Sequence, residues 1–354
     1  YNLNYKNPFN TNPIIIISEI KDLIMRSATY SNFGKPEDVL TLQDTPMPEP
    51  EPNEVRIKTL LSSIHNHDLI MIQGEYGEKP DLPAVGGSEA VGTIDALGDE
   101  VEGLKKGQRV VVSGAQGTWA DYFKAPADKV IPLPDAIDDE LAAQLIAMPM
   151  SALMLIEFLE LQPGQWLVHN GANGAVGMSL AQLASERGIN SINVVRSEDS
   201  KQELVDLGIT DNTVKTEDDD WQQQVKDILK QATGNPSIRG AVDAVGGQPG
   251  GELLSLVGKD GVMASLGGMT GKPLTLNPND LIFKQTQVKG FWGAVQMKEA
   301  TPETLQRLTA ELIDRAATGK LKLPTGGIYP LEDIKKAVSE EVQSDKKGKI
   351  LLKP

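Results

Sequence analysis

Hydrophobic and polar positions follow two different patterns along the chain. Between residues 54 and 134, short runs rich in branched side chains alternate with Gly and Pro: VRIKTLL at 55–61, AVGTIDAL at 90–97, RVVVSG at 109–114 and KVIPLP at 129–134. Such punctuated runs predict short β-strands. From about residue 142, apolar runs alternate with segments of helical periodicity, and this order predicts a parallel, doubly wound sheet.

The second region is expected to hold its elements at definite places. An apolar helix over 142–159 is expected to be interrupted near Pro149. A later helix, capped by Thr301 with Pro302 in its first turn, is expected to end at Gly319. Between them the predicted strands are WLVHN at 166–170, INVVR at 192–196, AVDAV at 241–245 and VMASLG at 262–267, and the predicted helices cover 176–187 and 199–207.

The order of these patterns predicts an α/β chain with two domains. A β-rich domain is expected over 25–150 and 292–354, interrupted by a Rossmann-type nucleotide-binding domain over 151–291. Residues 1–24 are rich in Asn, Ile and Tyr, unlike the rest, and are interpreted as an N-terminal extension.

Composition narrows the classes of function. The 354-residue chain has a formal net charge of −15, which argues against a nucleic-acid partner, because phosphate backbones are bound by clustered Lys and Arg. No apolar run reaches the roughly 18 residues of a membrane span, so no membrane partner is expected. The absence of cysteine removes disulfides, thiolate zinc sites and cysteine nucleophiles, and it fits a cytoplasmic location.

A glycine-containing turn joins the strand at 166–170 to the helix that follows it. The turn reads Ala172-Asn173-Gly174-Ala175-Val176-Gly177. Backbone N–H groups at the start of a helix, together with the helix dipole, favour a pyrophosphate there. Gly174 permits close approach of the ligand and Gly177 permits close helix–strand packing, so the turn predicts a dinucleotide site.

The next strand ends in a cation where dinucleotide sites for NADH carry a carboxylate. Arg196 closes INVVR, with Ser197 beside it and Lys201 nearby. A carboxylate at this point would repel a 2′-phosphate, whereas a guanidinium pairs with it. The sequence therefore predicts NADPH as the cofactor.

Together with four further motifs, these residues resemble the zinc-less medium-chain dehydrogenase/reductases. The motifs are MIQGEYG at 71–77, LPAVGGSEAVG at 82–92, GTWADY at 117–122 and LIFKQTQVKGFW at 281–292. Within that superfamily the chain looks most like the 2-enoyl thioester reductases and the quinone oxidoreductases. The resemblance covers roughly residue 25 to the C-terminus. It implies a GroES-like catalytic domain beside the Rossmann domain, and a homodimer formed through the edge strands of the nucleotide domains.

The resemblance also implies that no metal takes part. Where zinc members carry their three ligands, this chain has His65, Ser88 and a Met/Ala stretch around Met148. His65, His67 and Glu89 remain an alternative ligand set, because zinc requires three protein ligands and an open position. A zinc-type alcohol dehydrogenase therefore stays open. Otherwise His65 is expected to contact the substrate.

Without a metal, a side chain must protonate the substrate while hydride arrives from NADPH. Tyr76 is the candidate, since the enoyl thioester reductases carry a catalytic Tyr at the matching MIQGxYG position. The predicted activity is reduction of a conjugated C=C bond in a small molecule, such as a 2-enoyl thioester, enone or enal. Two alternatives stay open: a quinone oxidoreductase, in which Tyr76 only shapes the pocket, and a nucleotide-binding protein without turnover.

The remaining contacts are implied by position in the family. Leu266, Gly267, Gly268 and Met269 match the loop under the nicotinamide, and the backbone of Phe291-Trp292 matches the segment that holds its carboxamide. Trp292 is also expected to line the acyl pocket.

Two departures from the family flank this region. The reductases' N-P-x-T-A reads Met148-Pro149-Met150-Ser151-Ala152 here, so Ser151 replaces the Thr hydroxyl while Met148 cannot hydrogen-bond as Asn does. Their N-P-S-D reads His65-Asn66-His67-Asp68, in which Asn66 is the candidate for the missing amide.

Overall fold

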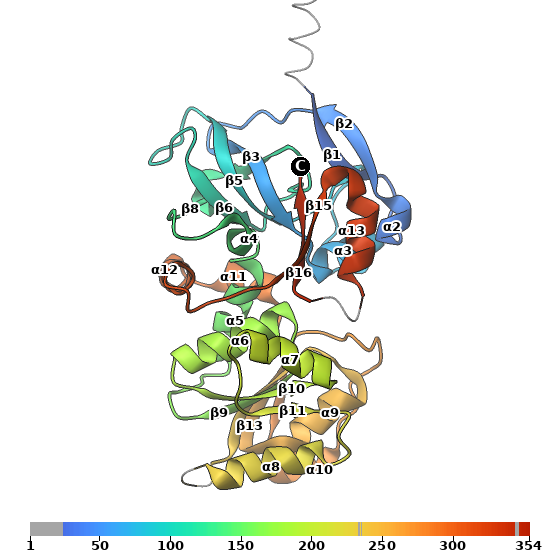
Figure 1. The fold of residues 1–354 in the computed structure, drawn as a ribbon, viewed down its shortest axis with the longest axis vertical. Helices are drawn as coiled ribbons and strands as arrows, with labels where there is room; N and C mark the ends of the chain where they lie inside the picture. The colour runs from blue at the N-terminus through green and yellow to red at the C-terminus, as the bar shows by residue number, and fades with distance from the viewer. Residues whose placement is uncertain (1–23, 233, 235, 344–346) are drawn as a thin grey trace, which may run out of the picture. The chain divides into compact units, whose positions relative to one another are not determined.

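The computed structural model describes residues 24–232, 234, 236–343 and 347–354 (Figure 1). The chain divides into two compact units, which we call unit 1 (residues up to 132, 327–344 and 350–354) and unit 2 (133–326 and 345–349). The predicted extension at 1–24 lies outside the described residues, apart from Ile24, which begins the first strand. The domain boundaries predicted at 150/151 and 291/292 stay predictions.

Unit 2 is built on a six-stranded parallel sheet with the strand order β11-β10-β9-β12-β13-β14. Its helices α6 and α7 cover one face and α8 and α10 the other (Figure 1). The predicted doubly wound sheet is confirmed. The bounds are β9 (Trp166–Asn170), α6 (Ala175–Glu186), β10 (Asn190–Val195), α7 (Glu198–Asp206), β11 (Thr213–Lys215), α8 (Trp221–Gln231), β12 (Ile238–Asp243), α9 (Gly247–Leu256), β13 (Val257–Ser265), α10 (Pro278–Lys284) and β14 (Gln287–Gly290).

The strand order places a switch point between β9 and β12. From β9 the chain runs outward through β10 to β11, and it then returns to the other side through β12, β13 and β14. Loops that leave the two central strands at their carboxyl ends diverge there, which leaves the crevice where open α/β sheets bind ligands. Val168, Ile192, Ala241 and Met263 are buried in the centre of the sheet, as expected for strands covered on both faces.

The remaining helices of unit 2 correct one prediction and confirm another. Pro149 does not interrupt a helix: the break lies between α4 (Asp139–Ala142) and α5 (Ala147–Phe158), and Pro149 occupies the first turn of α5. A proline is tolerated there because first-turn N–H groups have no intrahelical acceptor. After α11 (Gly293–Glu299), helix α12 (Pro302–Ala317) begins as predicted, with the Thr301 hydroxyl accepting from the N–H of Thr304 at 3.3 Å.

Unit 1 is β-rich, as predicted. A seven-stranded sheet has the order β15-β16-β3-β5-β6-β8, with β7 also paired to β3, and a three-stranded sheet has the order β2-β1-β4. The bounds are β1 (Ile24–Tyr30), α2 (Pro36–Val39), β2 (Thr41–Pro46), β3 (Glu54–Ser63), α3 (Asn66–Gln73), β4 (Ala84–Val85), β5 (Glu89–Leu97), β6 (Arg109–Ser113), β7 (Tyr122–Pro126), β8 (Ile131–Pro132), β15 (Thr325–Pro330), α13 (Ile334–Glu341) and β16 (Lys349–Lys353), with short 3-10 turns at Ala127–Lys129 and Leu331–Asp333.

The largest fully buried side chain of unit 1 explains a pair of glycines in the LPAVGGSEAVG motif. Trp119 is completely buried and its indole N–H donates to the carbonyl of Ser63 at 3.0 Å. A Cβ on Gly86 would lie 2.4 Å from this ring and one on Gly87 would lie 2.2 Å from it. Gly87 also has φ +91°. These glycines let the backbone pass over the indole and carry Ser88 and Glu89 into β5.

Within the described residues, no helix is long and apolar enough to cross a membrane.

Candidate active site

The predicted pyrophosphate turn lies between β9 and α6 in unit 2. Gly171 has φ +60°, and Gly174 is the residue that precedes the helix. A Cβ on Gly177 would lie 2.6 Å from the carbonyl oxygen of Ala172, so only glycine lets this helix approach the turn so closely. The first N–H groups of α6 have no intrahelical acceptor and face outward from the helix end, which is the arrangement that binds a pyrophosphate.

Sequence reasoning missed a cation beside this turn. A small hollow is lined by Asn173, Gly174, Ala175 and by Lys349, which is 8% exposed and belongs to the last strand of the chain. The Asn173 amide donates to Glu203 at 3.3 Å, so this side chain is directed toward α7. No local signal identifies Lys349, because it lies more than 170 residues beyond the turn in sequence.

Arg196 follows the last residue of β10 and is exposed. Among the residues that the structure describes, its guanidinium forms no ion pair with a carboxylate. The nearby acid Glu198 is instead bound by Lys215, whose Nζ lies 2.9 Å from Glu198 Oε2, and this contact raises the pKa of Lys215 and lowers that of Glu198. Ser197 caps α7 by accepting from the N–H of Ser200. The cation is therefore available to a phosphate.

The loop predicted to lie under the nicotinamide follows β13, and the Phe291-Trp292 segment follows β14. The N–H of Leu266 donates to the carbonyl of Asp243 at 2.9 Å, while Met269 is 76% exposed. Phe291 is buried, with its ring 5.4 Å from that of Phe158, and Trp292 is 36% exposed. Both segments thus leave the same carboxyl edge of the sheet as the glycine turn and Arg196.

Ser151 lies close to this last segment. Its hydroxyl donates to the carbonyl of Ala147 at 2.9 Å, one turn back in α5. A Cβ on Gly293 would lie 2.8 Å from the same hydroxyl oxygen. The structure therefore brings Ser151, from the Met148–Ala152 segment, next to the residues that follow Trp292.

In unit 1, residues 65–68 (HNHD), which differ from the family's N-P-S-D motif, form a hydrogen-bonded cluster at the start of α3. His65 is fully buried, and its Nε2 lies 2.7 Å from Ser63 Oγ and 2.7 Å from Glu89 Oε2. His67 is stacked on it with ring centroids 5.0 Å apart, and its Nε2 lies 2.7 Å from Ser88 Oγ. His65 has no exposed surface in this structure, and its expected contact with the substrate stays a prediction.

Tyr76 belongs to the same part of unit 1. It is half-buried, and its ring centroid lies 6.0 Å from that of His67. Asn66, the candidate for the missing amide, is exposed at the first turn of α3. The structure thus places Tyr76 beside the one histidine of the cluster that is partly accessible.

The residues of this cluster do not fit a zinc site. Over the described parts of the chain, no group of three or more His, Asp or Glu side chains is arranged to hold a metal ion. Each of the two imidazoles uses Nε2 for an oxygen neighbour, and Glu89 is directed at His65 rather than at a shared centre.

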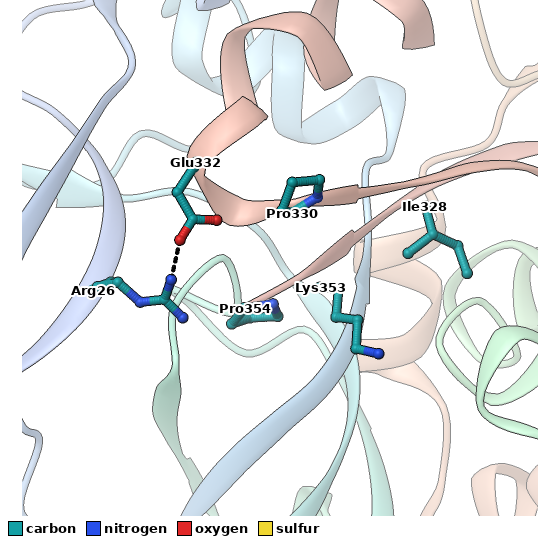
Figure 2. Close-up of a pocket in the computed structure, with 6 residues that line it drawn as sticks. All are labelled: Arg26, Ile328, Pro330, Glu332, Lys353 and Pro354. Atoms are coloured by element: carbon teal, nitrogen blue, oxygen red, sulfur yellow. Dashed lines mark hydrogen bonds and ion pairs between the residues drawn. The ribbon is translucent and has the colours of Figure 1, made fainter.

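Another hollow, which lies in unit 1, contains none of the predicted site residues. Figure 2 shows it between β15, β16 and Arg26, with the ion pair from Arg26 to Glu332 on one wall. Asp121 holds the same guanidinium at 2.7 Å from Nη2 and at 3.2 Å from Nε, and this contact raises the pKa of Arg26. Two carboxylates therefore neutralise Arg26, and the other cation on the lining of this hollow is Lys353.

Two family models and several relatives match the chain. The alcohol dehydrogenase GroES-like domain matches residues 51–135 and the zinc-binding dehydrogenase model matches 175–310. The mitochondrial enoyl-[acyl-carrier-protein] reductase of Rattus norvegicus is 34% identical over 325 residues, which cover 90% of this chain and 86% of the relative. That of Arabidopsis thaliana is 31% identical over 322 residues, covering 89% and 84%.

Among solved structures, the quinone oxidoreductase of Escherichia coli complexed with NADPH is similar with a TM-score of 0.82 and 26% identity, covering 93% of this chain and 100% of that one. Sequence and structure therefore agree with the resemblance inferred from the motifs. The chain belongs to the medium-chain dehydrogenase/reductase family, and its relatives there are enoyl reductases and quinone oxidoreductases.

Proposed function

We propose that this chain is an NADPH-dependent reductase that adds a hydride and a proton across a conjugated C=C bond, with Tyr76 as proton donor and no metal. The observation that carries the proposal is Arg196, exposed at the end of β10, one strand from the glycine turn and without a carboxylate partner among the described residues. The enoyl reductases among its relatives support the reaction, and the NADPH complex of a structural relative supports the cofactor.

The residues of unit 2 fit a phosphorylated dinucleotide. The start of α6 offers N–H groups to the pyrophosphate, and Gly177 permits the close packing that directs them. Lys349, on the hollow beside the turn, adds a cation near the same phosphates. Arg196 takes the 2′-phosphate, because its planar fork matches phosphate oxygens in a bidentate manner.

When bound, the dinucleotide supplies the hydride. Tyr76 supplies the proton: the hydride forms a C–H bond at the β-carbon, and the π electron pair takes the phenolic proton at the α-carbon. The phenolate left on Tyr76 then regains a proton from solvent. General acid catalysis of this kind contributes typically about 10²–10⁴-fold to a rate.

The test is NADPH oxidation by wild type and Tyr76→Phe, with a crotonyl-type thioester, a 2-alkenal and benzoquinone offered side by side. Tyr122→Phe, a half-buried tyrosine of β7 in the same unit, is the matched control. We expect a loss of about 10²-fold or more on the alkenes in Tyr76→Phe and none in the control. Equal alkene rates in all three proteins would refute the role of Tyr76.

A second candidate function is quinone reduction, favoured by the quinone oxidoreductase structures that resemble this chain. A quinone needs little acid assistance, so its rate should not depend on Tyr76. Turnover of benzoquinone at equal rates by wild type and Tyr76→Phe, with no turnover of either alkene, would establish this candidate in place of the first. Turnover of any acceptor excludes a protein that merely binds nucleotides.

We further propose that the chain forms a homodimer through unit 2. Strand β14 lies at the edge of the sheet, and the preceding helix α10 exposes Ile282 (58%) and Phe283 (76%). A free strand edge beside exposed apolar side chains is an association surface. Light scattering after gel filtration should give a dimer for wild type and a monomer for Phe283→Asp. A wild-type monomer would refute this assignment.

Composition and the relatives favour different cellular compartments for this protein. The absence of cysteine fits the predicted cytoplasmic location. The curated relatives are named mitochondrial. Imaging of the tagged full chain against a mitochondrial marker in its own cells distinguishes the two locations, and the cytoplasmic one stays a prediction.

A further inference from the structure

A buried polar pair joins the carboxyl ends of the two central strands of unit 2. The amide of Asn170, the last residue of β9, donates to Oδ1 of Asp243, the last residue of β12, at 2.7 Å. Asp243 is fully buried and Asn170 is 6% exposed. The pair lies at the switch point of the sheet, between the loops that carry most of the predicted cofactor contacts.

The same two side chains hold the loop that follows β12. Oδ1 of Asp243 accepts from the N–H groups of Val245 at 3.1 Å and Gly246 at 3.0 Å, and Oδ1 of Asn170 accepts from the N–H of Ala244 at 2.7 Å. Three consecutive backbone donors are therefore fixed by one amide and one carboxylate. Such bonds inside a sheet are strong because the local dielectric is low.

This loop in turn carries the loop predicted to lie under the nicotinamide. The N–H of Leu266 donates to the carbonyl of Asp243 at 2.9 Å. The N–H of Thr270 donates to the carbonyl of Val245 at 3.0 Å. A Cβ on Gly267 would lie 2.8 Å from the carbonyl oxygen of Ala244, so the two backbones are in direct contact. The position of the 266–270 loop therefore depends on the Asn170–Asp243 pair.

The adenosine end of the proposed site, at Arg196, is held by hydrogen bonds that do not involve the loop after β12. The carbonyl of Arg196 accepts from the N–H of Glu217 at 3.1 Å, and β10 is held by its neighbours β9 and β11. In the described chain, no hydrogen bond joins Arg196 to the loop after β12. Loss of the Asn170–Asp243 pair should consequently disturb one end of a bound dinucleotide and spare the other.

We propose that Asp243, supported by Asn170, is a positioning residue for the nicotinamide half of the cofactor. This inference rests on the proposed NADPH site. The bonds of this buried pair to three successive N–H groups fix the shape of one loop, because apolar residues in its place would leave those donors without acceptors. Asp243 acts through the 266–270 loop and not by direct contact with the cofactor or the substrate.

The test compares two ligands that differ only in the half at issue. Dissociation constants for NADPH and for adenosine 2′,5′-bisphosphate are measured by calorimetry on the full chain for wild type, Asp243→Ala and Asp243→Asn. We expect Asp243→Ala to weaken NADPH by about tenfold or more and the bisphosphate by less than about twofold. Asp243→Asn should remain within about threefold of wild type for both ligands, because its amide oxygen still accepts the same bonds.

Asn193→Ala is the matched control. Asn193 is a buried amide of the adjacent strand β10, bonded to His169 at 2.8 Å and to Thr213 at 3.3 Å rather than to a cofactor loop. It should lower the melting temperature without changing the ratio of the two dissociation constants. Equal weakening of both ligands in Asp243→Ala, or unchanged NADPH binding, would overturn the positioning role. If wild type binds neither ligand, the proposed function fails as well. If Asp243→Ala does not fold, Asn170→Ala provides the same comparison, because it removes the amide that bonds Asp243 and the N–H of Ala244.

Discussion

Replacement of Arg196 by Gln should lower the preference of the protein for NADPH over NADH by about tenfold. Arg196 is exposed at the end of β10 and, within the described chain, forms no ion pair that would compete for a phosphate. A second cation at this edge, Lys215, is already bound to Glu198 at 2.9 Å and to Asp218 at 3.4 Å. Loss of Arg196 should therefore remove the proposed partner of the 2′-phosphate.

The magnitude follows from the exposure of the site. A hydrogen bond to a charged group contributes about 1.5–3 kcal/mol, and solvent screening of an exposed pair favours the lower end of that range. A loss of about 1.5 kcal/mol corresponds to a dissociation constant for NADPH that is roughly tenfold higher. The dissociation constant for NADH should change by less than about twofold, because NADH has no phosphate at this position.

The assay is fluorescence titration of both nucleotides at low and at moderate salt. Arg239→Gln is the control, because Arg239 is an equally exposed cation of unit 2 that lies near the amino end of β12 and donates to the carbonyl of Asp260. The difference between wild type and Arg196→Gln should shrink as salt rises, since screening weakens the ion pair. An equal loss for NADH and NADPH, or a loss of the same size in Arg239→Gln, would refute the assignment of Arg196 to the 2′-phosphate.

Two further predictions concern the interior of unit 2. Gly177→Ala should lower the melting temperature and weaken NADPH by about tenfold or more, because its Cβ would lie 2.6 Å from the carbonyl oxygen of Ala172 and must displace the turn; calorimetry that finds unchanged affinity would contradict the account of the turn. Burial lowers the pKa of His169 to about 4, so the folded state keeps it neutral while the unfolded state binds a proton below about pH 6.5. The free energy of unfolding of wild type should therefore fall by about 2.5 kcal/mol more than that of His169→Gln between about pH 7 and pH 4.5, measured by urea unfolding, and parallel pH profiles would contradict the burial argument.

Contiguous residues explain why the glycine turn could be predicted from the sequence. The strand, the turn and the helix lie within residues 166–186, and each uses local chemistry: an apolar run, glycines where a Cβ would collide, and an apolar helix face. Arg196 was found by its spacing from the turn, because one βαβ unit fixes where the second strand ends. The fold class was predicted for the same reason, since strand–helix alternation is a local pattern repeated along the chain.

Partners that are distant in sequence could not be predicted in this way. Lys349 reaches the hollow beside the turn from the last strand, and Asp243 meets Asn170 across 73 positions of chain. Neither contact has a periodicity or a motif to indicate it. The first depends on where the last strand begins in the fold, and the second depends on the pairing of β9 with β12. The helix break expected at Pro149 was misplaced for a different reason. Proline breaks a helix in its interior but is tolerated in its first turn, where Pro149 lies.

The histidine cluster of unit 1 illustrates how far residue types alone determine a site. The sequence favours a hydrogen-bonded place in the pocket for the histidines, with His65 against the substrate, and leaves a metal site made of His65, His67 and Glu89 as the alternative. The structure separates them by burial: His65 and Glu89 are fully buried and bonded to each other, whereas His67 is directed at Ser88 and lies beside Tyr76. Because β3 and β5 are adjacent strands, the residues that follow one and begin the other are forced together. The bond from His65 to Glu89, together with the bond from the N–H of His65 to Asp68 at 2.9 Å, holds the start of α3, and His67 in its first turn lies beside Tyr76.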